Sequence, residues 1–160
     1  MSDTFDLAQQ LGHALKARGL MLATAESCTG GGVAQAVTDV PGSSEWFDCG
    51  FVTYSNVSKT ALLGVPADLI AAHGAVSKEV AAAMAAGALA KSRAQIAVSV
   101  TGIAGPGGAV PGKPVGTVWF GFAIGERVHS ECILFPGDRQ AVRDQAVHHA
   151  LRTLLHILRG

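Results

Sequence analysis

This sequence is poor in charge and carries no excess of either sign. Charged side chains make up 15% of the 160 residues, and 12 basic residues balance 12 acidic ones. Proteins that bind a phosphate backbone or an anionic membrane surface use clustered Lys and Arg, and the sequence contains no such block. We therefore expect neither a nucleic-acid partner nor a membrane partner.

Cysteines are few, and long apolar runs are missing. The three cysteines, Cys28, Cys49 and Cys132, are odd in number and widely spaced, so they match neither a disulfide framework nor a zinc pattern. No stretch reaches the roughly 18 consecutive apolar residues of a membrane span. Residues 1–19 are polar and amphipathic and lack the apolar centre of a signal peptide. These features predict a cytoplasmic protein.

Metal-binding patterns are also missing. His148, His149 and His156 fall in one expected helix, but the sequence contains no HExxH motif. His148 and His156 lie too far apart along a helix to share one ion. We expect no metal and no other cofactor.

The chain does contain enough apolar residues, 49% of the total, to bury the core of one domain. Apolar periodicity predicts helices at 4–18, 32–40, 57–64, 77–91 and from about 138 onward. Short apolar and β-branched runs predict strands at 20–25, 46–54, 95–100, 116–124 and 127–134. Strands alternate with helices over the first two thirds of the chain, and a hairpin follows. The fold class expected is α/β, a single three-layer α/β/α domain over residues 1–160 with a mixed, mostly parallel sheet.

Three loops rich in glycine and hydroxyl groups follow predicted strands, at 26–32, 54–59 and 101–108. Ligands of open α/β sheets bind beyond the carboxyl ends of the strands, where such loops gather. The third loop, which begins with Thr101 and Gly102, has no lysine followed by Ser or Thr and so is not a Walker A loop. Its glycines either let the backbone approach a ligand or build a tight turn.

The first loop places Ser27, Cys28 and Thr29 at a turn from strand to helix, followed by Gly30 and Gly31. Ser27 is either a nucleophile or, like Thr29, a helix cap, which is the commoner use of such residues. Backbone N–H groups at the helix start can hold an oxyanion or a phosphate. Cys28 could be the nucleophile instead, but it ranks below Ser27 because the sequence places no histidine to pair with it.

The second loop contains Lys59, with Tyr54 and Asn56 nearby. A lysine activates a serine only when neutral, so its pKa of about 10.4 must fall to near 7, which costs roughly 4 kcal/mol of desolvation or positive neighbours. The alternative is an ordinary solvated lysine. Asn56 stands where a Ser-x-x-Lys motif has its serine, so a serine partner must come from elsewhere, such as Ser27. Tyr54 either orients Lys59 or is an ordinary half-buried tyrosine.

Several segments together resemble the CinA C-terminal domain family. These segments are TAESCTGG, GFVTYSN-x-x-K, AHGAVS, TGIAGP-G, KPVGTVW and the late GDR, and they occur in the family's order. The resemblance runs from about Leu7 to Leu155, nearly the whole chain. Stand-alone members of the family are similar in length and are nicotinamide mononucleotide deamidases. The resemblance therefore implies hydrolysis of the nicotinamide carboxamide to nicotinate mononucleotide and ammonia, without a metal.

The resemblance also implies roles for individual residues. Ser27 would be the nucleophile and Lys59 its base in a serine–lysine dyad that forms an acyl-enzyme, with Tyr54 and Thr101 assisting. The residues expected to bind the small-molecule nucleotide are Thr29, Gly30, Gly31, Asn56, Gly102 and Arg139. Arg139 would contact the phosphate, and Arg143, one helical turn later, is the alternative.

Two other functions stay open at this point. The chain can be a non-catalytic, competence-associated protein that binds a nucleotide, or an amidase for a different amide. The resemblance further implies a homo-oligomer. Longer family members carry an N-terminal molybdopterin-binding-like domain, which this sequence lacks, so pyrophosphatase activity on ADP-ribose is not expected.

Overall fold

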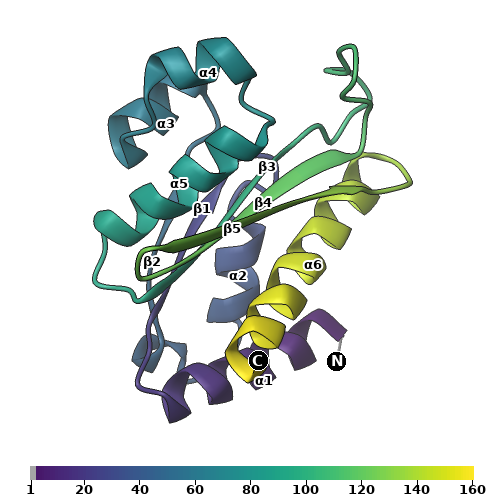
Figure 1. Cartoon of the computed structure of the whole chain (residues 1–160). Coiled ribbons are helices and arrows are strands. Elements are labelled where there is room, and N and C mark those ends of the chain that lie inside the picture. Colours follow the sequence, from purple (N-terminus) through teal and green to yellow (C-terminus); the bar gives the residue numbers. More distant parts are fainter. Residues whose placement is uncertain (1–2) are drawn as a thin grey trace.

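The computed structural model describes residues 3–160, in which a five-stranded sheet lies between two layers of helices (Figure 1). The sheet has the order β2-β1-β3-β4-β5, with bounds β1 Leu22–Glu26, β2 Phe47–Val52, β3 Ile96–Gly102, β4 Thr117–Ile124 and β5 Arg127–Leu134. β1 pairs in parallel with β2 and β3, whereas β3–β4 and β4–β5 are antiparallel. The mixed α/β sheet is confirmed, but parallel pairs make up half of it rather than most, because the late hairpin adds as many antiparallel pairs.

Helices cover both faces of this sheet. One side carries α1 (Asp3–Ala17), α2 (Gly32–Thr38) and α6 (Arg139–Arg159), and the other carries α3 (Asn56–Leu63), α4 (Ala67–His73) and α5 (Lys78–Ala90) (Figure 1). A short 3-10 turn, η1 (Ser43–Glu45), precedes β2. Across residues 3–160, no helix is long and apolar enough to cross a membrane.

The predicted helices and strands are all present, with boundaries within about two residues of those expected. α4 is the exception, because the sequence pattern did not predict it. Its two large apolar residues, Leu69 and Ile70, are adjacent rather than three or four positions apart, so the segment shows no helical apolar periodicity.

The two faces of the sheet present side chains of different size. On the face towards α6, the strands carry large side chains such as Val98 and Phe120, which pack in one buried cluster with Leu151. Towards α5 they point mainly small residues, including Ala23, Ala25, Ala97 and Ala123. This alternation follows from the period of two along a strand. Small side chains let α5 lie close to the sheet, so that a Cβ at Gly121 would overlap the carbonyl oxygen of Ala81.

The parallel strands bring their carboxyl ends to the same edge of the sheet. One residue beyond the pairing, the Thr53 N–H donates to the Glu26 carbonyl and the Ser27 N–H donates to the Val100 carbonyl, both at 2.9 Å. The first loop is therefore hydrogen-bonded on one side to the end of β2 and on the other to β3. This pairing fixes the position of Ser27.

Candidate active site

A cavity of about 260 Å³ opens where the loops after β1, β2 and β3 meet. All three predicted loops line it. Its walls are Ser27, Cys28, Tyr54, Asn56, Lys59, Ala75, Val76, Thr101, Gly102, Ala104 and Arg139. The expectation that these loops gather at one edge of the sheet is confirmed, because parallel strands end on the same side.

Lys59 is buried, with 1% of its surface exposed, and its amine points at Ser27. Nζ lies 3.1 Å from Ser27 Oγ, 3.0 Å from the Thr53 carbonyl oxygen and 3.1 Å from the Tyr54 carbonyl oxygen. Lys59 is therefore not a solvated surface lysine.

The position of Lys59 follows from the ends of α3. Ser55 Oγ accepts a hydrogen bond from the Ser58 N–H at 3.1 Å and so caps the first turn. Gly64 ends the helix in the left-handed conformation, with φ of 71°. Together these two caps fix the turn that carries Lys59.

Burial lowers the pKa of Lys59, because a desolvated ammonium is less stable than the neutral amine. A neutral lysine amine has two N–H bonds and one lone pair. The Thr53 and Tyr54 carbonyls can accept the two N–H bonds, which leaves the lone pair for the Ser27 hydroxyl. The contacts of Nζ thus suit a general base directed at Ser27.

Cys28 lines the same cavity but differs from Ser27 in its ionisation. Burial, aided by the nearby Glu26 carboxylate, raises the pKa of the Cys28 thiol to about 12, although Arg143 and Lys59 act in the opposite direction. The thiolate is the nucleophilic form of cysteine, and very little of it exists at neutral pH. Ser27 is therefore the stronger candidate nucleophile.

Glu26 is a functional candidate that the sequence pattern does not reveal. It is fully buried, and its carboxylate accepts hydrogen bonds from Thr29 Oγ1 at 2.6 Å, the Val33 N–H at 2.8 Å and the Ala34 N–H at 3.0 Å. The carboxylate thus caps the first turn of α2 from the preceding strand, where no capping-box spacing marks it. Thr29, predicted to bind substrate, turns its hydroxyl towards Glu26.

The two glycines after Thr29 shape the turn that follows Ser27. Gly30 and Gly31 have φ of 60° and 102°, values that glycine adopts without strain. The Gly30 N–H donates to the Ser27 carbonyl at 3.0 Å. The Gly30 N–H therefore already has an acceptor within the turn.

Tyr54 and Thr101 both line the cavity, but neither hydroxyl contacts Lys59. Tyr54 is 64% exposed, and its hydroxyl lies 3.4 Å from Arg139 Nη2, so Tyr54 reaches Lys59 through its carbonyl alone. The Thr101 hydroxyl donates to the Ala75 carbonyl at 3.0 Å and so joins two walls of the cavity. Gly102 lies so close to β4 that a Cβ would meet Val118.

Arg139 lies where the Ser27 cavity meets a second, larger one. It occupies the first turn of α6, after the N-cap Asp138, and its Nη1 donates to the Gly105 carbonyl at 2.8 Å. The second cavity, of about 660 Å³, shares Arg139 and Ala104 with the first and is also lined by Arg143. The two predicted phosphate contacts are thus both near the site, on one face of α6.

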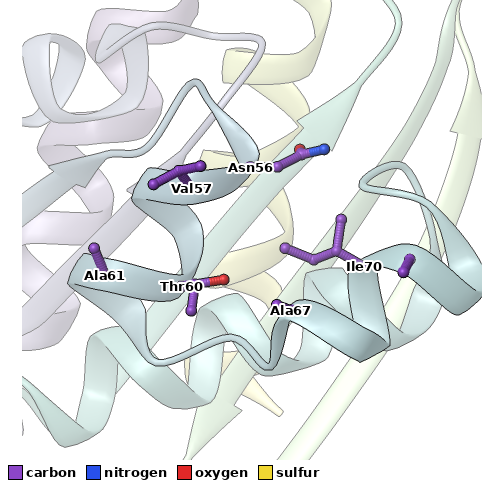
Figure 2. A pocket seen from close by; sticks show the side chains of 7 residues that line it. Asn56, Val57, Thr60, Ala61, Ala67 and Ile70 are labelled. Carbon is purple, nitrogen blue, oxygen red and sulfur yellow. The ribbon is translucent and has the colours of Figure 1, made fainter.

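Asn56 lies between the Ser27 cavity and an apolar groove of about 500 Å³. Figure 2 shows this groove, with Val57, Thr60 and Ala61 from α3 and Ala67 and Ile70 from α4. The groove lies beside the site without containing Ser27 or Lys59.

The histidines lie away from this cavity. His149 contacts Glu131 at 2.5 Å between α6 and β5, and His148 lies 3.5 Å from Thr4 Oγ1. In the part of the chain that the structure describes, no three His, Cys, Asp or Glu side chains are grouped to hold one metal ion.

The chain is similar to several known proteins over nearly its whole length. The model of the CinA C-terminal domain family matches residues 4–158. The chain is 56% identical over 156 residues to the nicotinamide-nucleotide amidohydrolase PncC of Escherichia coli K12, covering 96% of this chain and 93% of that protein. It is also 56% identical over 151 residues to the PncC protein of Pseudomonas putida, covering 94% of each. A crystal structure of a competence-damaged protein (CinA) superfamily member from Klebsiella pneumoniae matches with a TM-score of 0.96 at 39% identity, over 99% of both chains.

Proposed function

This chain belongs to the CinA C-terminal domain family, and we propose that it is a nicotinamide-nucleotide amidase that converts nicotinamide mononucleotide to nicotinate mononucleotide and ammonia. Relatives whose names state that activity match nearly its whole length at 56% identity. The observation that carries the proposal is the buried Lys59 amine, 3.1 Å from the Ser27 hydroxyl in a cavity formed by three loops.

In the first step, neutral Lys59 takes the proton of Ser27 while Ser27 Oγ attacks the carboxamide carbon. The Thr53 and Tyr54 carbonyls hold the two N–H bonds of the amine, so its lone pair stays directed at the serine. The positive pyridinium ring makes the carboxamide carbon more electrophilic. Backbone N–H groups of the turn after Ser27 stabilise the negative oxygen of the tetrahedral intermediate.

In the second step, protonated Lys59 returns its proton to the nitrogen of the intermediate. The C–N bond breaks, ammonia leaves, and the acyl group stays attached to Ser27 Oγ as an ester. Water then attacks this ester, with Lys59 again accepting a proton. The bond between Ser27 Oγ and the acyl carbon breaks, Lys59 returns the proton to Oγ, and nicotinate mononucleotide is released.

We propose one orientation for the substrate across the two adjoining cavities. The smaller one, next to Ser27, takes the nicotinamide ring, with Asn56 and Gly102 in its walls. The larger one takes the ribose and phosphate, and Arg139 at the junction offers the planar, charged fork that suits a phosphate. Thr101 and Tyr54 act by holding the cavity walls and Arg139.

The test is an assay of ammonia release from nicotinamide mononucleotide by the purified protein and two variants. Ser27→Ala and Lys59→Met are each expected to lower kcat by at least about 10³-fold, because both members of a catalytic unit are needed. Circular dichroism checks that the variants are folded. Full activity of Ser27→Ala would exclude Ser27 as the nucleophile.

The same assay with nicotinamide riboside and nicotinamide tests the substrate. We expect the nucleotide to react best, because only it offers a phosphate to Arg139. Similar rates on all three would remove the argument for a phosphate site. Binding of the nucleotide without release of ammonia would support a non-catalytic binding protein instead.

A further inference from the structure

Arg143 contacts the turn that follows Ser27, residues 27–30, which its position in the sequence does not suggest. Its Nε donates to the Cys28 carbonyl at 3.1 Å, and its Nη2 donates to the Thr29 carbonyl at 3.4 Å. A Cβ added to Gly30 would lie 3.3 Å from Nη2, so glycine leaves room for the guanidinium. One side chain of α6 thus holds the two carbonyls that directly follow Ser27.

These contacts also determine where the N–H groups of the turn point. A peptide unit is planar and trans, so its C=O and N–H face opposite sides. Because Arg143 binds the Cys28 carbonyl, the Thr29 N–H faces away from the guanidinium. Within residues 3–160 this N–H donates to no acceptor, whereas the Gly30 N–H is used by the Ser27 carbonyl. The Thr29 N–H is therefore a free donor with a fixed direction, two residues after the nucleophile.

Thr29 is held from a second side as well. Its hydroxyl donates to the buried Glu26 carboxylate at 2.6 Å, and 2% of the residue is exposed. Arg143 binds its carbonyl and Glu26 binds its side chain, so the residue has little freedom to rotate. A donor fixed in this way stabilises a developing oxyanion without having to reorganise during the reaction.

We propose that Arg143 is a positioning residue of the amidase, which orients the Thr29 N–H as an oxyanion donor and is not the phosphate ligand. The inference rests on the proposed function. It separates the roles of the two arginines of α6, since Arg139 faces the junction of the cavities while Arg143 binds the turn.

The first test compares Arg143→Lys with Arg139→Lys on the nucleotide and on nicotinamide riboside. Lysine keeps the charge but cannot span two carbonyls. For Arg143→Lys we expect kcat to fall about 10- to 100-fold on both substrates, with KM little changed, because a displaced donor should cost less than the roughly 10²–10³-fold that removal of a donor costs. For Arg139→Lys we expect a higher KM for the nucleotide alone. Arg159→Lys, on the same helix but bonded to Gln10, is the matched control and should change neither value.

The outcome that overturns the inference is a rise in KM for the nucleotide alone in Arg143→Lys, with unchanged turnover of the riboside. That result would make Arg143 a phosphate contact. The pH midpoint of kcat/KM should stay the same in Arg143→Lys, because Lys59 is untouched. If Arg143→Lys does not fold, as judged by its thermal transition, Arg143→Gln gives the same comparison.

A second readout does not depend on the amide substrate. A fluorophosphonate reacts with an activated serine: a P–O bond forms to Ser27 Oγ, the P–F bond breaks, fluoride leaves, and Lys59 takes the serine proton. The phosphoryl oxygen uses the same oxyanion donors, so Arg143→Lys should be labelled at least about 10-fold more slowly. Intact-protein mass measures the label, and Ser27→Ala shows that Ser27 carries it. Equal labelling rates overturn the inference.

The two readouts together distinguish the failure of each proposal. Suppose that the wild type releases no ammonia from nicotinamide mononucleotide, nicotinamide riboside or nicotinamide, and that Arg143→Lys is labelled more slowly. This result would reject the proposed function and keep the role of Arg143. Ammonia release with equal labelling and equal kcat would keep the function and reject that role.

Discussion

At the Ser27–Lys59 contact, the surroundings of the amine determine its chemistry. The side chain is buried, and Nζ contacts two carbonyls and one hydroxyl. These groups accept hydrogen bonds but carry no full negative charge to hold the proton on the amine. Desolvation is therefore the largest influence on the amine, and it lowers the pKa of Lys59.

The first prediction at this scale concerns the pH dependence of activity. Because neutral Lys59 is the proposed base, kcat/KM should rise with pH through one ionisation that lies below the ordinary lysine value of 10.5. Rates of ammonia release measured from pH 5 to about 10 give this profile. A rate that is constant or falls over this range would contradict the role of Lys59.

The lowered pKa of Lys59 also makes the stability of the fold depend on pH. Lys59 has a lower pKa in the folded state than in the unfolded state, so between the two values the unfolded chain binds more protons. The free energy of unfolding should therefore increase as the pH rises from the folded pKa to the unfolded one. Urea unfolding of the wild type and of Lys59→Met at several pH values isolates this contribution. An equal pH dependence in the two proteins would show that Lys59 does not cause it.

A further prediction concerns Cys28. Because burial raises the pKa of its thiol to about 12, iodoacetamide should leave it unmodified in the native protein while modifying the exposed Cys132. Cys28→Ala should retain kcat within about threefold and lose about 1 kcal/mol of stability, as is usual for removing a small buried group. Peptide mass mapping and the ammonia assay measure both effects. Loss of activity on the scale of Ser27→Ala would return Cys28 to the role of nucleophile.

At the scale of elements, the close contact between α5 and α3 holds the helix that carries Lys59. Leu63 is the last residue of α3, and a Cβ at Gly87 of α5 would overlap its carbonyl oxygen. Alanine normally stabilises a helix by about 1 kcal/mol relative to glycine. Here Gly87→Ala should instead destabilise the protein by about 2 kcal/mol, as overpacking does, and lower kcat by moving α3.

Urea unfolding and ammonia release test this effect. Gly107→Ala is the matched control, because a methyl group there meets no atom within 4 Å. Greater stability of Gly87→Ala would show that α3 moves aside without cost.

At the scale of the whole molecule, one sheet joins two apolar clusters. Leu151 belongs to the cluster on the α6 side and Met84 to the one on the α5 side, and both are fully buried. Because the strands are shared, we expect residues 1–160 to unfold as one domain in a single transition. Leu151→Ala and Met84→Ala should each lower the free energy of that transition by about 2–5 kcal/mol.

Coincident urea curves from circular dichroism and tryptophan fluorescence would support this expectation. Two separate transitions, each sensitive to one of the substitutions, would contradict it. The oligomeric state stays a prediction, for which sedimentation of the purified protein is the direct measurement.

The sequence by itself determined the elements and the place of the site. Apolar periodicity is local, so it located the strands and all helices except α4, and the glycine-rich loops marked the edge of the sheet where the candidate site lies. The family motifs also singled out Ser27 and Lys59, although the local pattern of each residue favoured a helix cap or a surface lysine.

The tertiary structure alone decided how these residues meet. Ser27 and Lys59 are 32 positions apart, and their contact depends on the parallel pairing of β1 with β2 and on the caps of α3. Glu26, at the end of β1, and Arg143, on α6, both bind the turn after Ser27, and no spacing in the chain predicts these contacts. The physical reason is that desolvation and hydrogen bonding depend on every atom nearby in space, whereas a sequence pattern reports the preferences of neighbours along the chain.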